Sequence, residues 1–185
     1  MKIALISDIH GNYHALEAVL EDIQRQQTDK VFVLGDIVFK GPLPERCVDT
    51  VRQLETVVLQ GNIDELVGTN RIQPGFAKSA GQEAALKQEM AWVRSRLSED
   101  QLNYLTELPM EHQLELENGQ VLRLVHATPQ NLLDVVTPME DEAGYERMFA
   151  GSNADIVAYG HIHLGYVRSF GGRMILNTGS VGLPF

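Results

Sequence analysis

The chain has 185 residues, about the length of one domain when roughly 150 residues are allowed per domain. It is 44% hydrophobic and 22% charged, which matches an ordinary folded domain and excludes a disordered, collagen-like or coiled-coil chain. A net charge of -10 opposes non-specific binding to nucleic acid or to an anionic membrane surface. Any phosphorylated substrate would therefore need local positive charge, and a bound divalent ion is often the largest charge in its site.

The cysteine content and the apolar runs bear on the cellular compartment. The single cysteine, Cys47, cannot form a disulfide within the chain and fits a reducing compartment. The longest early apolar run, Ile3 to Ile6, is too short for a signal peptide or a membrane span. We therefore expect a cytoplasmic protein.

The first sixty residues alternate between short apolar runs and amphipathic segments. Asn12 can cap a helix whose apolar residues recur at helical spacing, and a second helix is predicted over 44–54. Strands are predicted over 2–7, 31–34 and 56–59. This βαβαβ order predicts a largely parallel sheet with right-handed crossovers.

The rest of the chain is helical at first and then changes to strands. Apolar spacing predicts a helix from Leu86 to Leu97, and Ser98 with Gln101 forms a capping box that opens another. Asn118-Gly119 is a type I′ turn signal between two strands of a hairpin. A further helix and three strands are predicted over 140–149, 155–159, 166–170 and 173–176. We expect one mixed α/β domain spanning residues 1–185.

Five short polar motifs each follow one of the apolar runs. They are Asp8-Ile9-His10, Gly35-Asp36, Gly61-Asn62, His126 and Gly160-His161-Ile162-His163. In an open α/β sheet, ligands bind outside the carboxyl ends of the strands. Motifs that are far apart in the sequence are therefore expected to converge on one rim.

Taken singly, most of these motifs have an ordinary structural explanation. A helix cap, two turns and a hydrogen-bonded core histidine would account for the first four. The pair His161 and His163 is more specific, because alternation along an extended segment would send both rings to one side.

The combination of the motifs favours a metal site. Four of the six histidines, two aspartates and one asparagine fall at equivalent positions after apolar runs. A mixed nitrogen and oxygen ligand set suits Mn, Fe, Ni, Co or Zn better than Mg or Ca. Seven ligands exceed the needs of one tetrahedral ion. Two ions that share one carboxylate would use all seven ligands. Pairs of metal ions about 3.5 to 4 Å apart catalyse phosphoester hydrolysis in known enzymes.

The ordered set of motifs resembles the calcineurin-like metallophosphoesterase family over nearly the whole chain. The resemblance includes the longer segment Gly35 to Gly41 and the late motif Asn177-Thr178-Gly179-Ser180. Within that family the chain is similar to small bacterial and archaeal phosphodiesterases. This resemblance implies a four-layer α/β/β/α sandwich of mixed sheets, with a dinuclear site at its rim.

The resemblance also implies a role for each motif residue. One ion would be held by Asp8, His10 and His163, the other by Asn62, His126 and His161, with Asp36 as the bridging catalytic ligand. A hydroxide between the ions would be the nucleophile, because metal coordination lowers the pKa of bound water. Manganese is the first choice, with Fe, Ni, Co or Zn as alternatives. Asn12 and Lys40 are expected to contact the substrate, although helix capping and solvation explain them equally well.

Three features depart from the family pattern, of which Ala127, in place of the frequent glycine after His126, bears on packing more than on ligation. The family commonly carries a histidine where this chain has Ile63 beside Asp64, so the usual proton donor is absent. Either the enzyme favours acidic leaving groups, or a metal-bound water or Lys40 supplies the proton. The sequence ends at Phe185, where relatives often add further strands, so we expect a shortened C-terminal end.

The leading functional prediction is a metal-dependent phosphodiesterase acting on a small phosphoester. One alternative is a protein or nucleotide phosphatase built on the same core. Another is a non-catalytic scaffold that keeps the fold. A degenerate scaffold would be expected to have lost ligands, whereas all seven are present, so the enzyme is favoured. These motifs encode neither the physiological substrate nor the oligomeric state.

Overall fold

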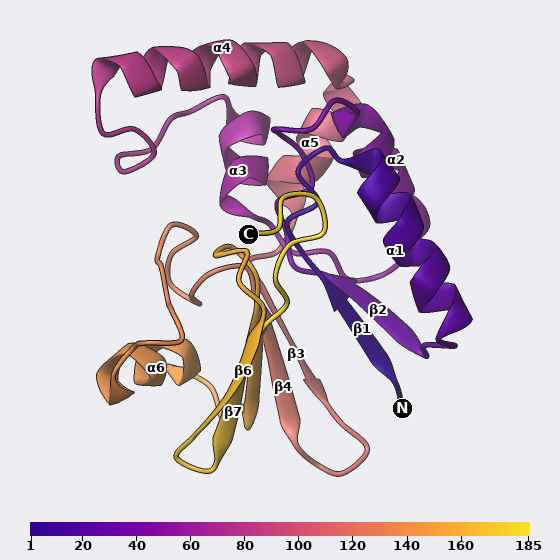
Figure 1. Cartoon of the computed structure of the whole chain (residues 1–185), viewed down its shortest axis with the longest axis vertical. Coiled ribbons are helices and arrows are strands. Elements are labelled where there is room, and N and C mark those ends of the chain that lie inside the picture. The colour runs from indigo at the N-terminus through magenta and orange to yellow at the C-terminus, as the bar shows by residue number, and fades with distance from the viewer.

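The computed structural model describes residues 1–185 and has mixed α/β architecture, as predicted (Figure 1). Its helices are α1 (Tyr13–Arg25), α2 (Pro44–Gln53), α3 (Asn62–Thr69), α4 (Ala80–Arg96), α5 (Glu99–Glu107) and α6 (Glu142–Phe149). Its strands are β1 (Ile3–Ile6), β2 (Lys30–Val33), β3 (Glu111–Glu115), β4 (Val121–Val125), β5 (Ile156–Tyr159), β6 (Tyr166–Phe170) and β7 (Arg173–Asn177). No helix combines the length and apolar character that a membrane crossing requires.

The strands form two sheets. In the first, β1 and β2 pair in parallel from Ile3 opposite Lys30 to Ile6 opposite Val33. The second sheet has the order β3-β4-β5-β7-β6. Its three central strands are parallel, and its edge strands β3 and β6 run antiparallel to their neighbours. The largely parallel pairing predicted for the first half of the chain is therefore confirmed for β1 and β2, whereas the second sheet is mixed.

The strand predicted over 56–59 is reduced to one parallel bridge between Val33 and Val58. The segment leaves β2 at Gln60, whose backbone N–H donates to the carbonyl of Pro109 at 2.8 Å. The following motif, Gly61-Asn62, for which a turn was one explanation, opens helix α3 at Asn62.

The hairpin between β3 and β4 is present, but its turn is not type I′. That turn needs a positive φ at both central residues, whereas only Gly119, at φ 81°, has one. Asn118 keeps a negative φ, and its side-chain oxygen accepts a hydrogen bond from the Gln120 N–H at 3.1 Å. This local bond stabilises the turn that Asn118 adopts instead.

The predicted helix caps are largely confirmed. Asn12 caps α1 by accepting from the Ala15 N–H at 3.2 Å, and the capping box of Ser98 and Gln101 opens α5. Helix α4 begins well before the predicted Leu86, because Ser79 caps it by accepting from the Gln82 N–H at 3.2 Å. Its first turns are mostly exposed and carry no apolar stripe.

Buried apolar side chains gather in three clusters. The largest joins β1 and β2 to the helices α1 to α5. The second includes Phe32 from β2 and Leu34 just after it, together with Leu122 and Leu124 from β4, so it lies between the sheets. The third lies between α6 and the second sheet, on the other side from α1 and α2 (Figure 1). The four-layer arrangement implied by the resemblance stays a prediction.

Candidate metal centre

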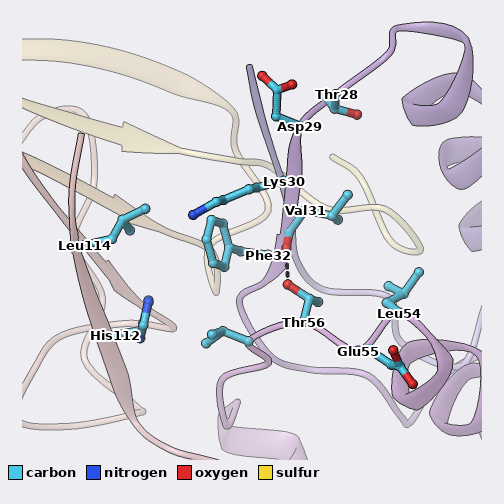
Figure 2. A pocket seen from close by; sticks show the side chains of 11 residues that line it. Thr28, Asp29, Lys30, Val31, Phe32, Leu54, Glu55, Thr56, His112 and Leu114 are labelled. Carbon is cyan, nitrogen blue, oxygen red and sulfur yellow. Dashed lines mark hydrogen bonds between the residues drawn. The ribbon is translucent and has the colours of Figure 1, made fainter. Parts of the chain in front are cut away.

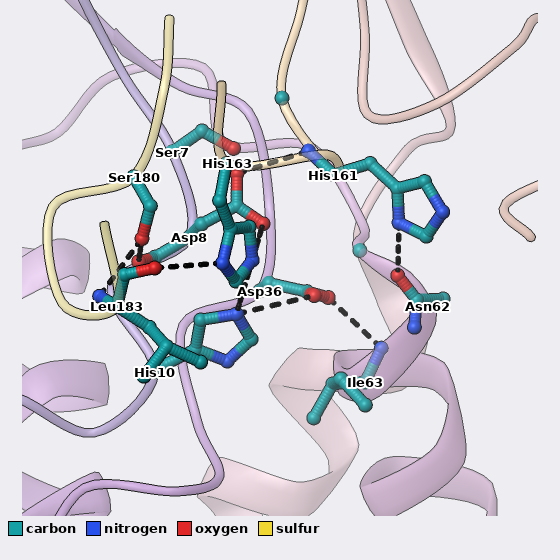
Figure 3. Close-up of polar contacts among 12 residues, drawn as sticks. Ser7, Asp8, His10, Asp36, Asn62, Ile63, His161, His163, Ser180 and Leu183 are labelled. Carbon is teal, nitrogen blue, oxygen red and sulfur yellow. Dashed lines mark hydrogen bonds and ion pairs between the residues drawn. The ribbon is translucent and has the colours of Figure 1, made fainter. Parts of the chain in front are cut away.

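The side chains of all seven predicted ligands meet at one edge of the two sheets. Asp8 and His10 follow β1, Asp36 follows β2, Asn62 begins α3, His126 follows β4, and His161 and His163 follow β5. In Figure 3, Asp8, His10, Asp36 and His163 lie together, and His161 lies beside Asn62. The predicted convergence on one rim is therefore what the structure shows.

One group of side chains surrounds the Asp8 carboxylate. His163 Nε2 lies 3.1 Å from Asp8 Oδ1, and His10 Nε2 lies 3.7 Å from the same oxygen. The two Nε2 atoms are 2.9 Å apart. These three residues offer one ligand atom each within 4.8 Å of one another, which fits a shared cation.

A second group surrounds the side-chain oxygen of Asn62. His126 Nε2 and His161 Nδ1 each lie 2.9 Å from Asn62 Oδ1. His126 is fully buried and directly follows β4 of the second sheet, whereas Asn62 is the first residue of α3. This group therefore joins the two halves of the fold at one point.

Asp36 lies between the two groups. Its Oδ2 is 3.8 Å from His10 Nε2, and its Oδ1 is 3.6 Å from His126 Nε2. The backbone N–H of Ile63 donates to Oδ1 at 2.9 Å and fixes the carboxylate (Figure 3). A carboxylate in this position can contact one ion in each group.

The hydrogen-bond pattern tests whether these residues fit metal ions. His126 Nδ1 lies 2.7 Å from the carbonyl of Leu34, so a neutral ring donates there and presents the Nε2 lone pair to Asn62 Oδ1. His163 Nδ1 is likewise 2.8 Å from the carbonyl of Leu183, and its Nε2 faces Asp8. In each group, a ring-nitrogen lone pair therefore faces an oxygen lone pair. A cation bound between the nitrogen and the oxygen would accept both lone pairs. The residues fit the metal ions that the resemblance implies.

Burial makes most of these groups suitable as ligands near neutral pH. Burial lowers the pKa of His10 and of His161 to about 4 and also lowers that of His126, so these rings are uncharged. Contact with Asp8 raises the pKa of His163 in the metal-free chain, where a proton can take the place of a cation. Burial and the neighbouring Asp8 and Asp64 raise the pKa of Asp36, and a bound cation would relieve that repulsion.

Backbone strain is concentrated at the candidate ligands. Five of the seven have positive φ: Asp8 at 56°, His10 at 49°, Asp36 at 54°, His161 at 67° and His163 at 57°. Residues other than glycine adopt this region at an energetic cost, and such residues cluster at functional sites. The prediction of an extended His-x-His segment is therefore wrong. The chain bends at both histidines and sends His161 to Asn62 and His163 to Asp8.

The glycine of the Gly-His motif allows a close approach to Asp8. A Cβ built on Gly160 would lie 2.5 Å from Asp8 Oδ2 and would also overlap the Ser7 hydroxyl. We therefore expect Gly160→Ala to displace Asp8, to weaken metal binding, and to destabilise the protein by about 1–3 kcal/mol. Metal titration and thermal unfolding measure the two effects.

Gly81→Ala is the matched control for this prediction. A Cβ at Gly81, in α4, meets no atom within 4 Å, so this change should stabilise the protein by about 0.5–1 kcal/mol. Unchanged metal affinity in Gly160→Ala would contradict the predicted role of this close contact.

The two predicted substrate contacts have other partners in the structure. Asn12 caps α1 through Oδ1, and its Nδ2 donates to the carbonyl of Gly182 at 3.1 Å. Lys40 Nζ lies 2.7 Å from Glu89 Oε2 on α4. Neither is brought into contact with the seven candidate ligands.

Asp64 has a structural role that sequence reasoning missed. It is fully buried, its Oδ1 accepts from the Ile37 N–H at 2.9 Å, and its Oδ2 accepts from the Gly61 N–H at 3.1 Å. It therefore ties the loop of Asp36 to the start of α3. The available signal was an acid two residues after the Gly-Asn motif, at the third position of the helix, where a carboxylate can accept from the backbone N–H of the residue that precedes the helix.

A mixed α/β fold with aspartate, asparagine and histidine ligands gathered at the carboxyl ends of its strands is typical of metal-dependent hydrolases. The model of the calcineurin-like phosphoesterase superfamily domain matches residues 1–185, and the chain belongs to that superfamily. It is accordingly a hydrolase of phosphoester bonds from a metal-dependent family, and the family resemblance drawn from its motifs is confirmed.

Individual relatives and a solved structure are similar to most of the chain. The chain is 31% identical over 186 residues to an uncharacterized protein of Methanocaldococcus jannaschii, covering 98% of this chain and 70% of that protein. It is 31% identical over 135 residues to a symmetrical bis(5'-nucleosyl)-tetraphosphatase of Erwinia tasmaniensis, covering 70% of this chain and 46% of that enzyme. A solved metallophosphoesterase structure from Sphaerobacter thermophilus has a TM-score of 0.73 at 27% identity, covering 100% of this chain and 78% of that chain.

Proposed function

We propose that the chain hydrolyses small phosphodiesters with two divalent transition-metal ions, manganese being the first choice. The observation that carries this proposal is the position of the Asp36 carboxylate between two adjoining ligand groups, 3.8 Å from His10 Nε2 on one side and 3.6 Å from His126 Nε2 on the other. A shared carboxylate is what a dinuclear centre requires.

The residues of the chain have distinct parts in this proposal. One ion would be held by Asp8, His10 and His163. The other ion would be held by Asn62, His126 and His161, and the Asp36 carboxylate would contact both ions. When bound, such ions lower the pKa of water and neutralise the phosphoryl oxygens. Backbone bonds to Leu34 and Leu183 orient the imidazoles of His126 and His163, so that the nitrogens facing the centre carry lone pairs.

The test compares a diester with a monoester. We expect manganese-loaded protein to hydrolyse bis(p-nitrophenyl) phosphate with a higher kcat/KM than p-nitrophenyl phosphate. A strong preference for the monoester would instead support the protein or nucleotide phosphatase alternative. The absence of hydrolysis with any of the five metals would support the non-catalytic scaffold.

The position of Ile63 leads to a prediction about the leaving group. Its side chain is buried in the largest apolar cluster and can neither donate nor accept a proton. Lys40, the alternative donor in this chain, is paired with Glu89. We therefore expect the rate to fall steeply as the pKa of the leaving group rises across a series of aryl and alkyl diesters.

Ile63→His is expected to flatten this dependence. A positioned general acid typically contributes roughly 10²- to 10⁴-fold, and most for poor leaving groups. Ile63→Val, which changes the side-chain volume without adding a proton donor, is the control and should leave the slope as it is. A flat series for the wild-type protein would show that another group supplies the proton.

The proposed cellular location is the cytoplasm. The proposal rests on the cysteine content, because Cys47 is the only cysteine of the chain and is buried.

A further inference from the structure

A cavity of about 370 Å³ lies between α4 and the loop that follows Asp36. Its walls include Lys40 from the loop, Phe76 and Lys78 from the segment before α4, and Gln82, Leu86 and Glu89 from α4. The same loop contacts the candidate metal centre, because the Gly41 N–H donates to the carbonyl of His10 at 2.7 Å. The cavity and the metal centre thus share one short loop.

The charge of this cavity sets it apart from the rest of the molecule. Its walls carry two lysines and one glutamate, although the chain as a whole has a net charge of -10. Each of four other surface cavities is lined by at least as many acidic as basic side chains. The largest of these, about 610 Å³ between β2 and β3, has Asp29 and Glu55 beside Lys30 (Figure 2). An anion is therefore favoured at the α4 cavity.

The backbone at Lys40 is strained, and its ion pair can be displaced. Phe39 and Lys40 are consecutive residues with positive φ, at 81° and 69°, a conformation that ordinary loops avoid. Lys40 Nζ lies 2.7 Å from Glu89 Oε2, but the two side chains are 49% and 32% exposed. Exposed ion pairs contribute little, so a phosphate group can compete with Glu89 for Lys40.

The opposite wall offers further donors and an apolar surface. The backbone N–H of Lys78 donates to Gln82 Oε1 at 2.8 Å, which leaves the Gln82 amide hydrogens and the Lys78 ammonium free to bind an anion. Phe76 and Leu86 add an aromatic ring and an aliphatic side chain to the same cavity. Cationic donors beside an aromatic ring suit a phosphate that is attached to a planar base.

We propose that the α4 cavity binds a second phosphate group of the substrate, as found in a nucleoside polyphosphate, while the metal centre holds the phosphate that is cleaved. This inference rests on the proposed function and narrows its substrate class. Lys40 and Lys78 bind the second phosphate, Glu89 competes with it, and Phe76 contacts the base.

Binding of inorganic tripolyphosphate to the metal-free chain in EDTA tests the cavity by calorimetry, independently of catalysis. We expect Lys78→Ala to weaken binding by about 3- to 10-fold, and Glu89→Gln to strengthen it by a similar factor, since each changes one charge beside the anion. Lys78→Arg should retain binding.

Lys87→Ala is the matched control. It removes the same charge from α4, but Lys87 pairs with Glu83 at 2.6 Å and lies outside the cavity lining. Equal losses in Lys78→Ala and Lys87→Ala would mean non-specific attraction and would overturn the proposal. All these side chains are on the surface, so thermal unfolding should show that every variant is folded.

Catalysis provides the second readout. In manganese-loaded protein, Lys78→Ala should lower the ratio of kcat/KM for a dinucleoside polyphosphate to that for bis(p-nitrophenyl) phosphate, and Glu89→Gln should raise it. A ratio unaffected by both variants would overturn the proposal. If no phosphoester is hydrolysed by the wild-type protein, the proposed function fails, and tripolyphosphate binding still decides whether the cavity binds anions.

Discussion

Asp36→Asn is expected to lower kcat/KM by roughly 10³-fold or more, because losing about 4 kcal/mol of transition-state stabilisation has that effect. Asp36 lies between His10 and His126, so its charge would serve both ions, whereas each histidine would serve one. Asparagine has nearly the same shape, and its oxygen can still accept the hydrogen bond from the Ile63 N–H. The loss would therefore come from the missing charge.

The metal-free variant should be at least as stable as the metal-free wild-type protein. Burial and the nearby carboxylates of Asp8 and Asp64 raise the pKa of Asp36, so ionised Asp36 destabilises the fold without a cation. This cost grows as the pH rises from the unfolded-state value of 3.8, and the difference in unfolding temperature should grow with it. If Asp36→Asn has lower activity but unchanged or higher stability without metal, then the Asp36 carboxylate serves function and not the stability of the fold.

The control for this substitution is Asp49→Asn on α2, which removes one carboxylate charge outside the centre. It should keep wild-type turnover and metal content. If Asp36→Asn keeps both ions and near wild-type turnover, while His161→Ala or His163→Ala abolishes activity, then Asp36 is only a turn residue.

The position of the candidate site was predictable because strand ends and polar motifs coincide in the sequence. Apolar runs end within two residues of Asp8, Asp36, His126 and His161, and parallel strands present their carboxyl ends at one edge. This reasoning needs only the strand order. It does not depend on side-chain conformations, so the position of the site is predicted correctly even where a single helix or strand is not.

The local geometry was less predictable. Helix α3 was missed although Ile63, Leu66 and Val67 have helical spacing, because Gly61-Asn62 is equally typical of a turn. Left-handed backbone at Asp8 and His161 contradicts local preference and is maintained by tertiary contacts. One such contact joins the His161 N–H to Asp8 Oδ2 at 3.0 Å across the two sheets. No pattern within a single segment encodes a bond between residues so far apart in the chain.

The pairing of Lys40 shows a further limit of motif reasoning. A basic residue after the Gly-Asp motif favours a phosphate contact, but the sequence does not reveal that Glu89 lies beside it. That glutamate belongs to α4, whose placement depends on packing against α2 and α3. Substrate contacts therefore depend on the helices around the core more than on the motifs.

Metal content is expected to follow the two ligand groups. Manganese-loaded wild-type protein should contain two ions per chain, and chelation should abolish hydrolysis. His163→Ala, from the Asp8 group, and His161→Ala, from the Asn62 group, should each retain one ion, because each removes a ligand from one group only. Asp36→Asn should lose both ions or bind both weakly. Elemental analysis of gel-filtered protein measures these numbers.

Metal binding should also stabilise the fold, because the ions neutralise buried Asp8 and Asp36. At a free metal concentration 100 times the dissociation constant, one ion adds about 2.7 kcal/mol to the free energy of unfolding. Chelation should therefore lower the unfolding temperature of the wild-type protein and change that of Asp36→Asn much less. His14→Ala and His112→Ala are the controls, since these two histidines lie outside both ligand groups and should leave two ions bound. A wild-type protein that is fully active with no more than one ion per chain would rule out the dinuclear centre.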